Sequence, residues 1–454
     1  MSVVYSIYNK VVKDRFVLVL VICHLLFFLY NICYNTTFIL LDSEEYYNLA
    51  SNILNHFEFY SGNINDVIEI EDYTKRPPLY SIFILVFSLF LKSYTLLFLV
   101  QNVLSISSIL IVKSIFEASF GKSKRVVLFL FIFLSLSQFI YANLMMSEML
   151  LQFLITLSIY LLYLIISQKR TSYLWYYQLL VILLFLTKPV FYLFVIPNIL
   201  VTFLVCRQIK VRFGTLKAII PIVAVMLYCQ WNYNRTGSYN FSSIQQINLV
   251  NYNLRYFHTN KYGVDYAQNI NSKIKEESEA VENYKNRLKL KNELVAEYIK
   301  KDLLSYGIFH IKGSARFFVD PGRFDIANFF NLKNSDEVGI LKHLNENGVS
   351  GVIDYFKTQS IIIILLFVTI LALSIVKLIG FTWFVVGLFK QNKLLWWIVI
   401  GIIIYISALT GPLGAARFIV PVLPFYTFAS IYGITALWKR IKGRSKVTTE
   451  LKHP

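Results

Sequence analysis

Apolar runs of roughly 20 residues, separated by short polar segments, recur along most of this chain. A helix needs about 20 apolar residues to cross the ~30 Å hydrocarbon core of a bilayer, so each run is a candidate transmembrane helix. We expect about ten spans, at residues 15–34, 94–116, 126–143, 149–166, 174–187, 190–206, 218–231, 360–378, 394–410 and 418–437. The pattern therefore predicts an all-α, polytopic membrane protein.

One apolar segment, residues 79–91 within "KRPPLYSIFILVFSLFLK", is too short to be a span. About 13 residues make ~20 Å of helix, against a hydrocarbon core of ~30 Å. We therefore expect an interfacial or re-entrant helix in the first outer loop, residues 36–93. If the segment were a span, the basic cluster "GKSKR" at 121–125 would change sides, so the charge pattern favours the shorter assignment.

Charge between the spans predicts the orientation of the protein in the membrane. Lys and Arg collect at 10–15, 121–125, 168–170 and 207–217 and after residue 437, and the positive-inside rule places these segments in the cytoplasm. Residues 36–74 contain no Lys or Arg and are rich in Asp and Glu. We therefore expect this loop on the outer face and both termini in the cytoplasm.

We divide the chain into four parts by this topology. These are an N-terminal transmembrane module (1–231) that includes the outer loop, an extracytoplasmic segment (232–356), C-terminal transmembrane helices (357–440) and a basic cytoplasmic tail (441–454). In the extracytoplasmic segment, Val281, Tyr284, Leu288, Leu294 and Tyr298 recur among charged residues at nearly helical spacing. That spacing predicts an amphipathic helix over the outer face.

The amino-acid composition agrees with a membrane protein and argues against nucleic acid and metal ions as binding partners. Of 454 residues, 56% are hydrophobic and 15% are charged, and the mean hydropathy is +0.57. The net charge of +18 does not indicate a nucleic-acid partner, because lysines and arginines gather in short clusters between the apolar runs, as the positive-inside rule expects. The cysteines lie in or beside apolar runs without metal-ligand spacing. We expect no metal and no cofactor.

Six charged residues fall at the predicted outer ends of the spans although they are far apart in the chain. They are Asp42, Lys75, Arg76, Glu148, Lys188 and Arg417. A charge at the membrane boundary is costly unless it is solvated or paired, so a set on one side suggests a polar cavity that opens outward. Two carboxylates with three or four cations suit an anionic ligand, such as a phosphate ester, that needs a base nearby.

Each of these residues also has a purely structural interpretation. Asp42 and Glu45 fit an N-terminal capping box, D-x-x-E, for a helix through residue 54. Arg76 and Lys188 could extend to lipid headgroups, and Glu148 could be a favourable first-turn acid. Arg417 has the weakest structural explanation, because a positive charge at the start of the last span opposes the helix dipole.

Six short motifs resemble the GT-C superfamily of membrane glycosyltransferases, in particular its protein O-mannosyltransferase and aminoarabinose-transferase branch. In chain order they are Asp42 in "LLDSEEYYNLA", "KRPPLYSIF", Glu148 in "MMSEMLLQF", "FLTKPVFYLFVIP", "NYNRTGSYNFSSIQQINLVNYN" and "AARFIVPVLPF". The resemblance covers nearly the whole chain, and the order of the motifs makes it more specific than any one of them. The chain departs from the family in having Asp42-Ser43 for the usual Asp-Glu and Asn234-Arg235 for Arg-Asn.

The resemblance implies transfer of a sugar from a polyprenyl-phosphate carrier to a hydroxyl acceptor (protein, lipid A or glycan) on the outer face. Asp42 would be the general base of an inverting reaction, and Glu148 would orient the sugar or acceptor. The donor phosphate would be held by Arg417, Arg76, Lys188 and Lys75, and the sugar and acceptor groove would be lined by Glu44, Glu45, Tyr46, Tyr80 and Arg235. With the family's distribution, the abundance of Ile, Asn, Lys, Tyr and Phe favours a bacterial inner membrane.

Three other functions remain open at this point. A lipid or sugar transporter or flippase would also need an outward polar cavity, but inverted repeats are typical of transporters and none is found in the sequence. An enzyme similar to O-antigen polymerases would share the topology and the large outer loop, without the early aspartate and Pro-Pro motif. A sensor or scaffold would use the outer amphipathic segment to bind a partner.

Overall fold

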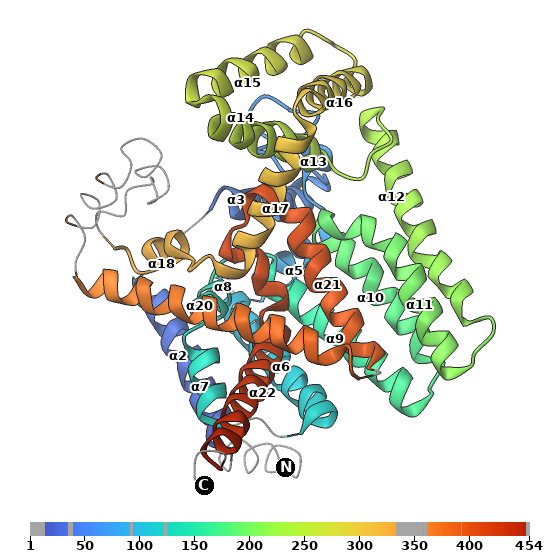
Figure 1. Cartoon of the computed structure of the whole chain (residues 1–454). Coiled ribbons are helices and arrows are strands. Elements are labelled where there is room, and N and C mark those ends of the chain that lie inside the picture. The colour runs from blue at the N-terminus through green and yellow to red at the C-terminus, as the bar shows by residue number, and fades with distance from the viewer. Residues whose placement is uncertain are drawn as a thin grey trace.

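The computed structural model describes residues 14–34, 40–90, 94–121, 125–332, 361–391 and 393–450, together with Ser350 and Lys357. The expected basic cluster before residue 14, residues 333–349 and 351–356 of the extracytoplasmic segment, and residues 451–454 of the tail lie outside the described residues. Within them the regular secondary structure is entirely helical (Figure 1). An all-α, polytopic membrane protein is therefore confirmed.

The first half of the chain forms a bundle that begins with α2 and ends with α12. Its helices are α2 (Arg15–Tyr34), α3 (Leu41–His56), α4 (Asp72–Lys75), α5 (Pro78–Ser88), α6 (Thr95–Phe120), α7 (Arg125–Phe133), α8 (Leu136–Tyr141), α9 (Glu148–Gln168), α10 (Tyr173–Thr187), η1 (Pro189–Phe194), α11 (Val195–Ile209), η2 (Gly214–Ala218) and α12 (Ile219–Thr236). The short apolar helix expected in the first outer loop is α5, which begins at Pro78.

The second half forms a helical cap, defined here as α13 to α18, and then returns to the bundle. The cap comprises α13 (Ile244–Asn248), η3 (Leu249–Leu254), α14 (Arg255–Tyr262), α15 (Val264–Glu279), α16 (Tyr284–Lys301), α17 (Leu303–Val319) and α18 (Arg323–Phe329). The last bundle helices are α20 (Ile361–Leu388), α21 (Leu394–Thr410), η4 (Gly411–Leu413), η5 (Ala416–Val422) and α22 (Leu423–Glu450). Helix α22 extends through most of the segment that was expected to be a cytoplasmic tail.

Eight of the described helices are long and apolar enough to cross a membrane. The expected span 126–143 is not one continuous helix, because it breaks at Ser135, whose backbone (φ −88°, ψ 69°) leaves the α region. Beyond the break, Gln138 turns into the bundle and bonds Ser105 and Gln152, so α8 packs as a short buried helix. The expected span at 174–187 is α10, which has only 15 residues.

The bundle buries polar side chains and exposes apolar ones. On α2, His24 and Asn31 are buried while Leu18, Leu25 and Leu29 are exposed. An exposed apolar stripe of this kind is unfavourable in water and favourable against lipid tails. The surface pattern therefore supports the membrane assignment independently of helix length.

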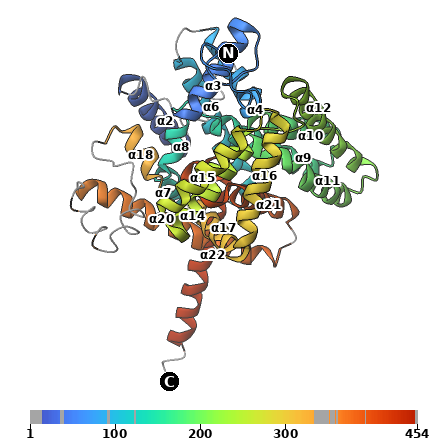
Figure 2. The ribbon, with the colours of Figure 1, turned by 90° about the horizontal axis from the view of Figure 1, so that it is seen from above.

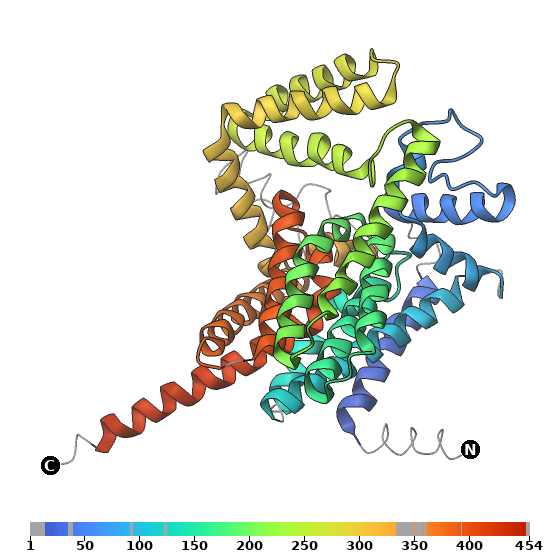
Figure 3. The same ribbon diagram turned by 90° about the vertical axis from the view of Figure 1, so that its right-hand side faces the viewer.

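Different segments of the chain lie at the two ends of the bundle. The cap lies at one end, and the first residues of α2 and the last turns of α22 lie at the opposite end (Figures 1 and 3). Seen from above, α14, α15 and α16 lie over the middle of the bundle (Figure 2). The amphipathic segment expected as one helix is two, because α15 ends at Glu279 and the side chain of Asn283 accepts a hydrogen bond from Asn286 N to begin α16.

Two glycines let α20 and α22 cross in close contact. A Cβ atom on Gly433 would lie 1.8 Å from the carbonyl oxygen of Gly380, and one on Gly380 would lie 2.3 Å from the carbonyl oxygen of Ser430. Small residues at such crossings let helix backbones approach in membranes. The helix expected at 360–378 runs unbroken past Gly380 to Leu388.

We expect Gly433→Leu to destabilise the protein by about 3 kcal/mol or more, because overpacking alone costs about 1–3 kcal/mol and here the clash is with backbone. The measurement is thermal unfolding of the purified protein in detergent. Gly387→Leu on α20 is the matched control, since a Cβ atom there meets nothing within 4 Å. Equal melting temperatures for the two variants would contradict the close crossing.

Candidate functional site

Asp42 lies in the first turn of α3, at the cap end of the bundle. The expected capping box is wrong, because α3 begins at Leu41 after Leu40 and has no side-chain cap. The Asp42 and Glu45 carboxylates instead bind Arg76, with Nη2 2.6 Å from Asp42 Oδ1 and Nε 2.5 Å from Glu45 Oε2. A charged partner 34 residues away therefore outcompetes the backbone N–H groups of the helix.

Arg76 is fixed by its place in front of two prolines. Its backbone is extended (φ −113°, ψ 126°), as the residue before a proline prefers, and α5 begins two residues later. The side chain is only 8% exposed and lies 5.1 Å from the ring centroid of Tyr46. Arg76 is therefore a buried cross-link between the start of α3 and the start of α5.

Arg417 reaches the same carboxylate from the other end of the chain. Its Nη1 is 3.0 Å from Asp42 Oδ2, although the two residues are 375 positions apart. The loop before Arg417 turns at Gly411 and Gly414, which have φ values of +36° and +47°, a region that favours glycine. Asp320 at the end of α17 accepts the N–H of Ala416 at 2.6 Å, which fixes the backbone next to Arg417.

Glu148 and Lys188 form a second ion pair beside the first. Glu148 is the first residue of α9, and Lys188 has extended backbone before Pro189. The Lys188 Nζ is 2.6 Å from Glu148 Oε1. Glu148 is fully buried, and its Oε2 has no hydrogen-bond partner within the described part of the chain. A buried carboxylate oxygen without a partner is costly and suggests that a ligand binds there.

Aromatic and amide side chains beneath the ion pairs hold the site in position. Tyr46 and Tyr80 are buried with their ring centroids 4.9 Å apart, and the Tyr46 hydroxyl donates to Ser147 Oγ at 3.3 Å. The Tyr80 hydroxyl donates to Gln101 Oε1 at 2.8 Å. Gln101 in turn donates to the carbonyl of Leu144. These bonds fix the turn before α9, and with it Glu148, against the first outer loop.

The charges around Asp42 control its protonation. Burial alone would raise the pKa of the Asp42 carboxyl, but Arg76, Arg417 and Lys188 together hold this pKa well below its usual range. Burial would likewise lower the pKa of Arg76, and Asp42 with Glu45 raises it above the usual range. With both arginines in contact, Asp42 is a permanent carboxylate and a weak base.

Two further carboxyl groups adjoin the site, and the sequence pattern did not single them out. Asp320 holds the Ala416 N–H, and Asp325 on α18 lies beside the Tyr141 hydroxyl. Burial raises the pKa of Asp325 to about 7, Asp320 and Glu148 add to the rise, and Tyr141 and Arg417 oppose it. The one available signal was the turn sequence "DPGRFD", which resembles an ordinary loop between helices.

We expect Asp325→Asn to flatten the pH dependence of stability. The folded protein holds the Asp325 proton up to about pH 7 and the unfolded chain only to about pH 4, so stability falls as pH rises between these values. At ~1.4 kcal/mol per pKa unit the effect is at most about 4 kcal/mol. Thermal unfolding at pH 5 and pH 8 measures it. Asp265→Asn, on an exposed position of α15, should keep the wild-type slope, and the same slope in both variants would contradict the assignment.

The structure does not bring every predicted residue to the site. Glu44 is exposed. Lys75 pairs with Glu45 at 2.7 Å rather than with Asp42. Arg235 donates to the carbonyl of Phe59 at 3.0 Å and lies 3.6 Å from the ring centroid of Trp231. These contacts connect α12 to the first outer loop, so Arg235 has a structural setting outside the Asp42 cluster.

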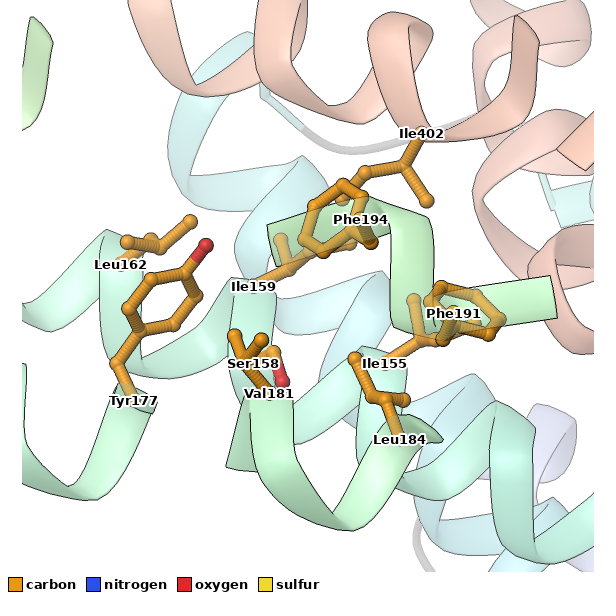
Figure 4. A pocket seen from close by; sticks show the side chains of 10 residues that line it. All are labelled: Ile155, Ser158, Ile159, Leu162, Tyr177, Val181, Leu184, Phe191, Phe194 and Ile402. Carbon is orange, nitrogen blue, oxygen red and sulfur yellow. The ribbon is translucent and has the colours of Figure 1, made fainter. Parts of the chain in front are cut away.

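A small pocket lies deeper in the bundle, between α9, α10, η1 and α21 (Figure 4). Its lining is apolar apart from Ser158 and Tyr177, and it includes none of the predicted site residues. An apolar gap of this kind is more typical of a packing defect or a space for a lipid chain than of a binding site for a charged ligand. No group of three His, Cys, Asp or Glu that could hold a metal occurs among the residues that the structure describes.

Comparison with protein-family models, curated proteins and solved structures finds no match for this chain. Two arginines and a lysine surround two carboxylates at the end of an apolar bundle. Cations of this kind can neutralise a phosphate, and a fixed carboxylate can accept a proton.

Proposed function

We propose that this protein is a membrane glycosyltransferase that moves a sugar from a polyprenyl-phosphate carrier to a hydroxyl acceptor. The observation that carries the proposal is the contact between Asp42 and Arg417 at 3.0 Å. It joins the first and last of the six motifs that resemble the GT-C superfamily. The acceptor is a protein, lipid A or another glycan, because the chemistry requires only a hydroxyl group.

The charges suit a lipid-linked phosphodiester donor. Its polyprenyl chain would lie in the bilayer and its phosphate at the boundary, where Arg417 lies at the start of an otherwise apolar helical segment. A guanidinium can hold a phosphate through two parallel hydrogen bonds. Arg417 is the first candidate for this contact, because its side chain is 30% exposed, compared with 8% for Arg76.

The reaction is a single displacement at the anomeric carbon. The acceptor oxygen forms a bond to that carbon while the bond from carbon to the phosphate oxygen breaks, and the phosphate leaves with the electron pair. The proton of the acceptor hydroxyl passes to Asp42. Arg417 stabilises the charge that grows on the leaving phosphate, and attack from the face opposite the phosphate inverts the anomeric centre.

Glu148 and Lys188 have supporting roles in this proposal. The unpartnered Oε2 of Glu148 can accept a hydrogen bond from a sugar or acceptor hydroxyl, while Lys188 neutralises the other oxygen. Lys188 also lies 5.6 Å from the ring centroid of Phe418, next to Arg417. The second ion pair therefore connects the sugar-binding region to the phosphate-binding region.

The site faces outward in this proposal. It lies at the cap end of the bundle, while the basic clusters at 168–170 and 207–217 and the last turns of α22 lie at the other end (Figure 3). By the positive-inside rule, this arrangement supports a site on the extracytoplasmic face. We propose a bacterial inner membrane as the location.

A donor-turnover assay tests the proposal. Purified protein in detergent is incubated with a labelled polyprenyl-phosphate sugar and a membrane extract as the source of acceptor, and released polyprenyl phosphate is measured. The proposal predicts release that depends on both Asp42 and the acceptor. Movement of intact donor across vesicle membranes without release would instead identify a transporter and end the proposal.

A further inference from the structure

Asp42 is held by two arginines that are bound in different ways. Arg76 contacts both Asp42 and Glu45, and its side chain is 8% exposed. Arg417 is 30% exposed, and Asp42 is the only carboxylate within 4.0 Å of it in the described part of the chain. Moving Arg76 would break two ion pairs in a buried position, whereas moving Arg417 would break one ion pair in a half-buried position.

The two arginines also occupy different oxygens of the carboxylate. Arg76 takes Oδ1 and Arg417 takes Oδ2. If Arg417 left, Arg76 would still fix the position of Asp42 through Oδ1, and Oδ2 would become free to accept a proton. A carboxylate that loses one of two cationic neighbours becomes a stronger base.

We propose that the anionic headgroup of the donor binds by drawing Arg417 away from Asp42, so that the donor itself releases the base that activates the acceptor. This inference rests on the proposed function. It adds the order in which the substrates bind, with the donor first and the acceptor second. The carboxylate and the phosphate compete for the same guanidinium fork. The empty enzyme therefore keeps its base blocked until a donor is present.

The surrounding structure allows this exchange without a large movement. The backbone beside Arg417 is fixed by the bond from Ala416 N to Asp320, so only the Arg417 side chain has to move. The Arg417 guanidinium also lies 4.8 Å from the ring centroid of Phe418. Asp42 keeps Arg76 throughout, which leaves the general base in place.

The competition makes a prediction about binding alone. Removing the Asp42 charge should strengthen the binding of polyprenyl phosphate, because the phosphate no longer has to displace a carboxylate from Arg417. We expect Asp42→Asn to lower the Kd for polyprenyl phosphate about tenfold. Binding is measured on the full-length protein in detergent, with the uncharged polyprenol as the control for chain binding. Asp42→Ser replaces the variant if Asp42→Asn is not recovered folded.

The gain must depend on Arg417. In the double variant Asp42→Asn, Arg417→Ala the Kd should return to that of Arg417→Ala alone. Asp66→Asn is the matched control, because it removes an exposed carboxylate of the same outer loop that lies outside the cluster. We expect it to change the Kd less than threefold.

The possible results distinguish a failure of this inference from a failure of the proposed function. If the wild type binds polyprenyl phosphate and Asp42→Asn does not bind it more tightly, the displacement is wrong while the proposed function stands. The same holds if the gain persists without Arg417 or if Asp66→Asn gives an equal gain. If the wild type binds polyprenyl phosphate no better than polyprenol, the proposed function fails and the inference fails with it.

Discussion

Asp42→Asn is expected to lower the turnover of a polyprenyl-phosphate sugar by about 10²-fold or more while the protein stays folded. The amide keeps the size of the side chain but cannot take the proton of the acceptor, and a positioned base contributes about 10²–10⁴-fold to such reactions. Both arginines lose a carboxylate partner, so folding must be verified by thermal unfolding. The measurement is kcat for release of polyprenyl phosphate.

The matched control is Asp66→Asn, which changes an exposed carboxylate of the same outer loop that lies outside the cluster. It should keep the wild-type kcat. The combination that most clearly supports a base is lost turnover with retained or stronger donor binding. Near wild-type turnover in Asp42→Asn would remove Asp42 from its proposed role.

Arg417→Ala is expected to lower kcat/KM for the donor by about 10²–10³-fold, the usual cost of removing one donor to a developing anion. Both kcat and KM should change, because the phosphate is present in the bound donor and gains charge as it leaves. Arg417→Lys should recover part of the loss, since it restores the charge but not the two-point contact of the guanidinium.

The control for Arg417 is Arg170→Ala, an exposed arginine that stacks on Tyr173 in the segment between α9 and α10. It should leave the donor kinetics unchanged. Unchanged kcat and KM in Arg417→Ala would show that the arginine is only a structural partner of Asp42.

Local sequence rules predicted much of the fold but not its breaks. Proline at residues 77 and 78 correctly placed the start of the short helix α5, because proline is well suited to the first turn of a helix. The same approach treated residues 126–143 as one apolar span. It missed the break at Ser135, which depends on the pairing of Gln138 with Gln152 on a different helix. Such long-range pairing leaves no trace in local hydropathy.

The candidate site shows the same division between local and long-range information. Arg417 was singled out because a cation at a helix start opposes the dipole, and the structure gives it a carboxylate partner. The spacing of Asp42 and Glu45 also fits a capping box, yet the Asp42 side chain pairs with a distant arginine. Asp320 and Asp325 were missed, because their proximity to the site depends on how the cap packs on the bundle.

The described segment 232–332 also contacts the two loops that carry the arginines. Ser242 Oγ, just before the cap, donates to the carbonyl of Lys75, next to Arg76, and the Ser407 hydroxyl before the Arg417 loop donates to the carbonyl of Ser314 on α17. This segment therefore does more than cover the bundle. It fixes the spacing of the cations around Asp42, which a phosphate-binding site requires to within about 0.5 Å.

The most direct test of the account is an experimental structure of the full-length protein with polyprenyl phosphate bound. The account predicts the phosphate within hydrogen-bond distance of the Arg417 guanidinium, with Arg417 withdrawn from Asp42 and Arg76 still in contact with it. A phosphate bound elsewhere, with Asp42 and Arg417 still paired, would contradict it.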